Sequence, residues 1–147
     1  MATMQTFEQI EEDFEYLDDW EDRYRYVIEI GRELPDMPDR DKSDANKVQG
    51  CVSQVWLTTT VKDPHSEDPV LNYQGDSDAH IVRGLVAIAL AAYSGKRASV
   101  ILGLDENDVF SRLGLIENIT PQRANGLRAL VRRIKQEAAR ASAAAAG

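Results

Sequence analysis

The residue of this 147-residue chain that is best equipped for covalent chemistry is Cys51, its single cysteine. One cysteine cannot form a disulfide within the chain, so its thiol is either a buried apolar side chain or a working nucleophile. Cys51 follows Gly50 and stands at the expected junction between a loop and a strand. Because glycine has no side chain, the reactive group of another protein can approach a neighbouring sulfur closely. The local sequence leaves two alternatives of equal weight, a structural cysteine and a thiol that takes part in exchange reactions.

The positions of the two histidines, His65 and His80, bear on whether Cys51 could take part in hydrolysis or metal binding. A hydrolytic cysteine needs a histidine base hydrogen-bonded to its thiol, and a zinc or cluster site needs several converging ligands. His65 lies in the turn-rich segment KDPHSEDP, where we expect it to be solvated, and His80 falls in the first turn of an expected helix. A cysteine-nucleophile hydrolase is therefore a weaker alternative, and we expect no metal site.

Charged residues near the thiol are candidates for site support or docking, together with Gly50. Arg123 falls in the first turn of the last expected helix, where the helix dipole favours an anion and a guanidinium adds to that effect. Asp76 is expected first to form a turn or an N-cap, with a place beside the Cys51 loop as a second role. Lys47, Asp76 and Arg123 would form a set of mixed sign, suited to orienting a partner protein. On spacing alone, a surface arginine paired with an acid accounts for Arg123 equally well.

The distribution of charge argues against nucleic acid and membrane partners. The net charge is −8, and residues 1–45 hold fifteen acidic and five basic residues while residues 46–147 have a net charge of +2. A nucleic-acid binder usually presents a clearly basic face. The longest apolar stretch, from Gly84 to Tyr93, is too short to span a bilayer, and the acidic N-terminus lacks the pattern of a secretory signal. We expect a cytoplasmic protein.

Hydrophobic periodicity, caps and breakers define the expected elements. A capping box at Thr6 begins the first predicted helix, Asp19 caps the second, and Asp76, Ser77 or Asp78 caps a core helix that ends at Tyr93. Two strands, Val52–Val61 and Val70–Gln74, should form an antiparallel hairpin. The remaining predictions are a loop over 35–47, short helices over 97–102 and 106–113, and a long last helix that begins at Pro121 after a Thr120 cap.

These elements predict a single α+β domain over residues 1–147, with helices packed on one face of a small antiparallel sheet. The helix that ends at Tyr93 is apolar almost all round, so it should be central. The alanine-rich end, from about residue 140 to residue 147, is expected to fray.

Several segments resemble the SufE family of sulfur acceptors, in order and over most of the chain: GCVSQVWL at 50–57, QGDSDAHIVRGLVAI at 74–88, FSRLGL at 110–115 and ITPQRANGL at 119–127. The resemblance implies an α+β fold similar to that of the cluster scaffold IscU. The family often has histidine where this chain has Asn118, so no role for that histidine is carried over. Within the last segment, Asn125 and Gly126 are interpreted as packing residues rather than as part of the chemistry.

What the resemblance implies about function centres on Cys51, which would receive sulfur as a persulfide from a SufS-type cysteine desulfurase. It also implies stimulation of that desulfurase and delivery of sulfur to downstream iron–sulfur scaffold proteins. The chain would bind no cofactor itself, because the pyridoxal phosphate belongs to the desulfurase. Transfer between sulfurs is thiol exchange, for which one accessible cysteine is sufficient. The alternatives are a cysteine-nucleophile hydrolase, a metal or cluster scaffold, and an interaction module in which Cys51 is incidental.

Overall fold

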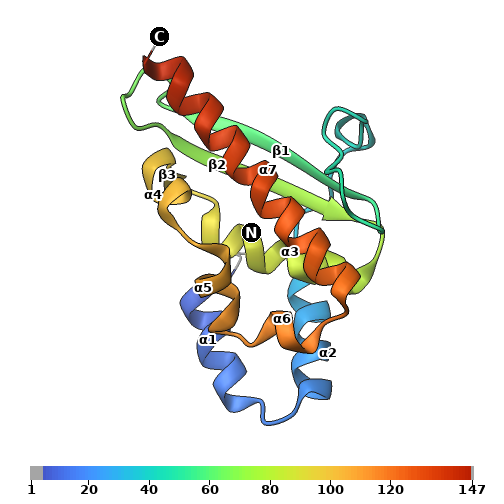
Figure 1. The fold of residues 1–147 in the computed structure, drawn as a ribbon. Coiled ribbons are helices and arrows are strands. Elements are labelled where there is room, and N and C mark those ends of the chain that lie inside the picture. The colour runs from blue at the N-terminus through green and yellow to red at the C-terminus, as the bar shows by residue number, and fades with distance from the viewer. Residues whose placement is uncertain (1–4, 147) are drawn as a thin grey trace.

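The computed structural model describes residues 5–146 as helices arranged around a three-stranded antiparallel sheet (Figure 1). The strand order is β1-β2-β3, and the strands are β1 (Val55–Lys62), β2 (Val70–Ser77) and β3 (Lys96–Arg97). The β1–β2 register runs from Val55 opposite Ser77 to Lys62 opposite Val70. The predicted hairpin and the α+β class are confirmed. The prediction placed the start of β1 three residues too early, ended β2 too soon, and missed the two-residue strand β3.

Helices α1 (Phe7–Tyr16) and α2 (Trp20–Arg32) form the predicted helical hairpin at the lower end of Figure 1. Thr6 and Gln9 form the expected capping box, in which the Gln9 amide donates to the Thr6 hydroxyl at 3.2 Å. The Asp22 amide donates to the Asp19 carboxylate at 2.8 Å. Both caps satisfy backbone groups that a helix start otherwise leaves without partners.

Helix α3 (His80–Tyr93) is the centre of the core, and most of its residues are buried. Its start corrects the prediction for Asp76, Ser77 and Asp78, because Ala79 occupies the N-cap position and no side chain caps the helix. Asp76 and Ser77 instead end β2, where pairing with β1 extends the strand. The carboxylate of Asp78 accepts from the Gln54 amide at 3.1 Å, so it binds the loop before β1.

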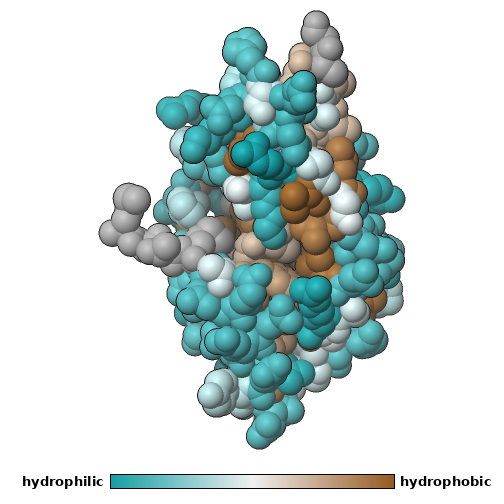
Figure 2. All heavy atoms as spheres, turned by 90° about the vertical axis from the view of Figure 1, so that its left-hand side faces the viewer, coloured by the Kyte–Doolittle hydropathy of each residue, from teal (hydrophilic) through white to brown (hydrophobic). Residues whose placement is uncertain are grey.

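The remaining short elements are η1 (Asp39–Asp41), which lies in the loop after α2, and three helices between α3 and the last helix: α4 (Ala98–Gly103), α5 (Glu106–Ser111) and α6 (Leu115–Asn118). Asp105 caps α5 as predicted, and the short helix α6 was not predicted. Two residues of α4, Val100 and Leu102, are 46% and 42% exposed. Figure 2, which views the side on which Figure 1 shows α4, shows hydrophobic residues gathered among hydrophilic ones.

Helix α7 (Pro121–Ala146) crosses the sheet and covers it (Figure 1). The Tyr73 hydroxyl on β2 donates to the Ile134 carbonyl at 2.8 Å, and Ile134 and Ala138 are fully buried. The helix continues to Ala146, where the sequence suggested fraying, and Ala141 is still buried. Among residues 5–146, no helix is long and apolar enough to cross a membrane.

Candidate functional site

Cys51 lies in the turn of a small hairpin that precedes the main one. The Val48 amide donates to the Val55 carbonyl, and the Leu57 amide donates to the Asn46 carbonyl, both at 2.8 Å. Lys47 forms a bridge with Trp56 between these two hydrogen bonds. We call residues 46–57 the Cys51 hairpin. Its arms are 46–48 and 55–57, so the thiol stands in a turn four residues before β1 rather than directly at the strand.

Gly50 gives the turn a backbone conformation that other residues rarely adopt, with φ at +94°. A Cβ atom at this position would also lie 3.2 Å from the Cβ of Ala129 on α7. The glycine is therefore required both by the turn and by the close approach of the last helix. This explanation differs from the one that the sequence suggested, which was access for a partner.

The thiol of Cys51 faces α7. Its Sγ lies 3.5 Å from the Gly126 carbonyl oxygen, to which it donates a hydrogen bond. A Cβ atom at Gly126 would stand 3.5 Å from the same sulfur, which is an ordinary contact distance, so the thiol lies directly against this position of α7. Cys51 is half-buried, and burial raises the pKa of its thiol because a thiolate is poorly solvated there. Burial therefore favours the protonated thiol over the thiolate in the resting protein.

A cavity of about 220 Å³ opens beside the sulfur. Its apolar wall comes from β1, α3 and α7, and its polar edge comes from the turn and from the start of α7. Val52, next to Cys51, is 83% exposed at this opening. The apolar residues of the wall are Val55, Val82, Leu85, Val86, Leu127 and Leu130, and the polar residues are Ser53, Thr120, Gln122 and Arg123.

Arg123 shares this cavity with Cys51 and is held by α2. Its Nη1 donates to the Tyr24 hydroxyl at 2.7 Å, and its guanidinium carbon lies 5.9 Å from the centre of the Tyr24 ring. Its backbone amide donates to the Thr120 hydroxyl at 3.2 Å, which is the predicted cap of α7. Within residues 5–146, no carboxylate lies within ion-pair distance of Arg123. The alternative of a surface arginine paired with an acid therefore does not describe this geometry.

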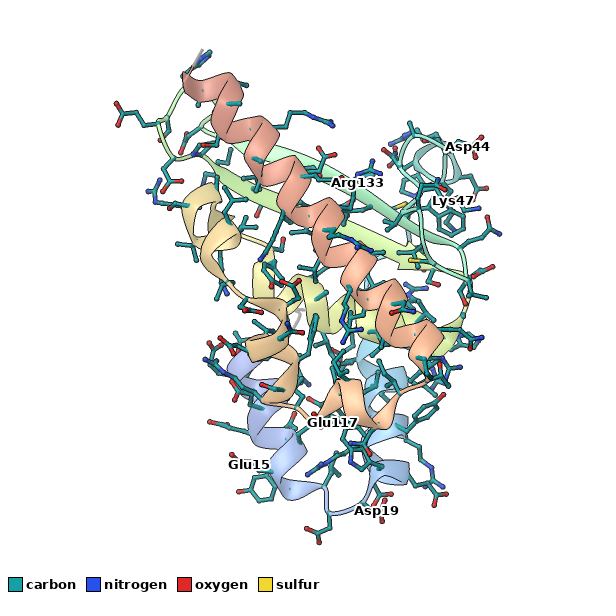
Figure 3. All side chains as sticks on the ribbon, viewed as in Figure 1. Glu15, Asp19, Asp44, Lys47, Glu117 and Arg133 are labelled. Carbon is teal, nitrogen blue, oxygen red and sulfur yellow. The ribbon has the colours of Figure 1, made fainter. Side chains whose placement is uncertain are left out.

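Lys47 and Asp76 do not line the cavity. Lys47 contributes its backbone, whose carbonyl accepts from Arg133 Nη1 at 3.3 Å (Figure 3). Asp76 is buried, and its carboxylate lies 3.6 Å from Lys42 Nζ and 3.5 Å from Arg83 Nε. Lys42 Nζ also lies 5.4 Å from the centre of the Trp56 ring, so this ionic cluster supports the arms of the hairpin rather than the turn that carries the thiol.

Neither histidine accompanies the thiol. His65 and His80 are exposed, and neither of them lines the cavity. The part of the chain between residues 5 and 146 also contains no group of three or more histidine, cysteine or carboxylate side chains that could hold a metal ion.

Sequence reasoning missed two features of this site. Gly126 was interpreted as a packing residue, yet its carbonyl is the hydrogen-bond acceptor of the thiol. Nothing in the sequence indicated that the hydroxyl of Tyr24 on α2 holds Arg123. A glycine facing the thiol gives no signal in the sequence, because the contact joins residues that are 75 positions apart.

One family profile and two known proteins show the family of this chain. The family profile SufE, described as an Fe-S metabolism associated domain, matches residues 8–138. An uncharacterised SufE-like protein of Rhizobium meliloti (strain 1021) is 59% identical over 92% of this chain and 96% of its own length. A second such protein, of Rhizobium etli, is 58% identical over 92% of this chain and 90% of its own length.

A solved structure with the same fold is the solution structure of a hypothetical protein from Thermus thermophilus. It superposes with a TM-score of 0.71 at 20% identity, and the match covers 92% of this chain and 94% of the other. That likeness concerns the fold, whereas the profile and the two relatives concern the family. The chain belongs to the SufE family, whose domain is associated with iron–sulfur metabolism.

Proposed function

We propose that this protein accepts sulfane sulfur on Cys51 from a SufS-type cysteine desulfurase and delivers it for iron–sulfur cluster assembly. The observation that carries the proposal is the place of the thiol: the single cysteine stands in a turn, half-buried, at the opening of a cavity with an apolar wall. A turn at the end of a hydrogen-bonded hairpin can present a sulfur to another protein. The SufE family membership supplies the metabolic context.

The proposed step is a thiol exchange in which atoms and electrons balance. The thiolate of Cys51 attacks the outer sulfur of the persulfide on the desulfurase, and a new S–S bond forms while the donor's S–S bond breaks. The donor cysteine leaves as a thiolate and takes up the proton that Cys51 released. No external oxidant or reductant is required, because the sulfane sulfur keeps its oxidation state as it moves.

The cavity gives the transferred sulfur a sheltered place. A persulfide that pointed into solvent would react with other thiols, whereas apolar side chains around it limit access. The pyridoxal phosphate of the overall reaction belongs to the desulfurase, and the proposal assigns no cofactor to this chain. Stimulation of desulfurase turnover would follow if acceptance of sulfur frees the donor cysteine for its next cycle.

Intact-mass measurement tests the proposal. The purified protein is incubated with a SufS-type desulfurase and free cysteine, and it should gain the mass of sulfur atoms in a form that a reductant removes. Cys51→Ser is the matched control and should gain none. Sulfur still bound to Cys51→Ser would contradict the proposal, as would an unmodified wild-type protein in the presence of an active desulfurase.

The same variant separates the alternatives. A protein that only docks would keep its stimulation of the desulfurase in Cys51→Ser, which would favour an interaction module. A hydrolase would show esterase or peptidase activity that is lost in His80→Ala, although His80 lies outside the Cys51 cavity.

A further inference from the structure

Arg133 on α7 binds the chain just before the Cys51 turn. Its Nη2 donates to the Ala45 carbonyl at 2.7 Å, and its Nη1 donates to the Lys47 carbonyl at 3.3 Å. The third donor of the fork, Nε, pairs with Glu137 at 3.2 Å. Figure 3 shows Arg133 extending from α7 toward the loop that carries Asp44 and Lys47. A planar guanidinium spreads its donors over three nitrogens in a fixed fork, whereas the three donors of a lysine share one nitrogen.

The two carbonyls belong to the first arm of the Cys51 hairpin or stand directly before it. That arm is held to the second arm by the Val48–Val55 and Leu57–Asn46 hydrogen bonds. In the turn itself, the contacts with α7 include the close approach of Gly50 to Ala129 and the hydrogen bond of the thiol to Gly126. Arg133 therefore adds charged, directional bonds between hairpin and helix to the packing of Val48 and Val55 in the core.

We infer that Arg133 is a positioning residue: by fixing residues 45–47 to α7, it holds the Cys51 thiol against Gly126 and at the cavity. This inference rests on the proposed function for its biological meaning, because the position of the thiol matters only if the thiol reacts. Its geometry stands independently of that function. The guanidinium touches neither the sulfur nor the cavity wall, so it acts through the backbone of the hairpin.

Arg133→Gln is the informative variant, since it keeps an apolar stem and removes the fork and the charge. Arg132→Gln is the matched control, because Arg132 is exposed and its side chain makes no hydrogen bond or ion pair with any residue between 5 and 146. Loss of two charge-assisted bonds should shift the hairpin toward detachment by roughly tenfold. Arg133→Lys, which can donate to only part of the acceptor set, should fall between wild type and Arg133→Gln.

Alkylation of Cys51 by iodoacetamide, measured across pH, reports on the position of the thiol. In Arg133→Gln the rate should rise by about tenfold, and the pH midpoint should fall toward that of a denatured cysteine because the thiol becomes solvated. Arg132→Gln should match wild type. Equal alkylation profiles in wild type, Arg133→Gln and Arg132→Gln would overturn the inference.

Amide hydrogen exchange separates positioning from general stability. Exchange at Val48 and Leu57 should accelerate in Arg133→Gln while the amides of α2 keep their wild-type rates. Acceleration of α2 to the same extent would show global destabilisation and would also overturn the inference. Neither measurement uses a desulfurase, so a protein that accepts no sulfur but shows these changes would refute the proposed function and leave the role of Arg133 standing.

Discussion

Substitution of Gly50 by alanine should destabilise the protein through the turn that carries the thiol. Two terms oppose the substitution: a positive φ of +94° costs a residue with a side chain about 1–2 kcal/mol, and the new Cβ would stand 3.2 Å from that of Ala129. One term favours it, because alanine lowers the entropy of the unfolded chain by about 0.4–1 kcal/mol. The free energy of unfolding should therefore fall by about 1–2 kcal/mol once the crowding is included.

Urea unfolding followed by circular dichroism measures this change, and the chain offers a matched control. Gly103, at the end of α4, has no atom within 4 Å of an added Cβ and no positive φ, so Gly103→Ala should be neutral or slightly stabilising. Adding Ala129→Gly to Gly50→Ala should relieve the crowding but not the backbone strain, and a double-mutant cycle isolates the two terms. A Gly50→Ala protein as stable as wild type would refute the strained turn.

The thiol, the buried carboxylate and Arg123 each have a separate test. Because burial raises the pKa of Cys51, alkylation of the native protein should have a higher pH midpoint than alkylation of the denatured chain. The contribution of the thiol to stability is full below the unfolded pKa and is lost as pH rises through the folded pKa. Urea unfolding of wild type and Cys51→Ser in alkaline buffers would show this loss. Coincident midpoints would contradict this. Asp76→Asn should lower the free energy of unfolding by about 1–3 kcal/mol, since it leaves the partly buried cations Lys42 and Arg83 without their shared anion. An effect no larger than that of Asp78→Asn, at an exposed carboxylate, would count against a stabilising role of the Asp76 ion pairs. Arg123→Ala should slow sulfur acceptance from the desulfurase more than it slows alkylation by a small neutral reagent; equal loss in both assays would assign Arg123 to thiol activation, and no loss in either would leave it structural.

The sequence predicted those parts of the fold whose signals lie within a few residues. The caps at Thr6, Asp19 and Thr120 were found because a cap depends on a side chain and an amide no more than three positions apart. The β1–β2 hairpin followed from two runs of strand-forming residues separated by a turn-rich segment. The prediction for Asp76 was wrong because its position depends on pairing with Trp56 and on ion pairs with Lys42 and Arg83, which the residues directly around Asp76 do not encode.

The site could be predicted only as far as its central residue. Cys51 is visible as the single cysteine, and Arg123 was selected from the first turn of its helix. What holds each of them is distant: the thiol and Gly126 are 75 positions apart, and Arg123 and Tyr24 are 99 positions apart. The short strand β3 and helix α6 were missed for a related reason, because elements of two and four residues carry too little periodicity to detect.

The position of the Cys51 thiol depends on how α7 packs, because the turn that carries the thiol contacts this helix. Gly50, Cys51 and Lys47 each touch a residue of that helix, and the last of these contacts joins residues 86 positions apart. Such contacts form only when the two segments lie together, so the shelter of the sulfur depends on the attachment of the helix. A partner protein that lifted the turn away from α7 would expose the sulfur and lower the pKa of the thiol at the same time, because both depend on burial. Protection at rest and reactivity on docking would then be two positions of one hairpin.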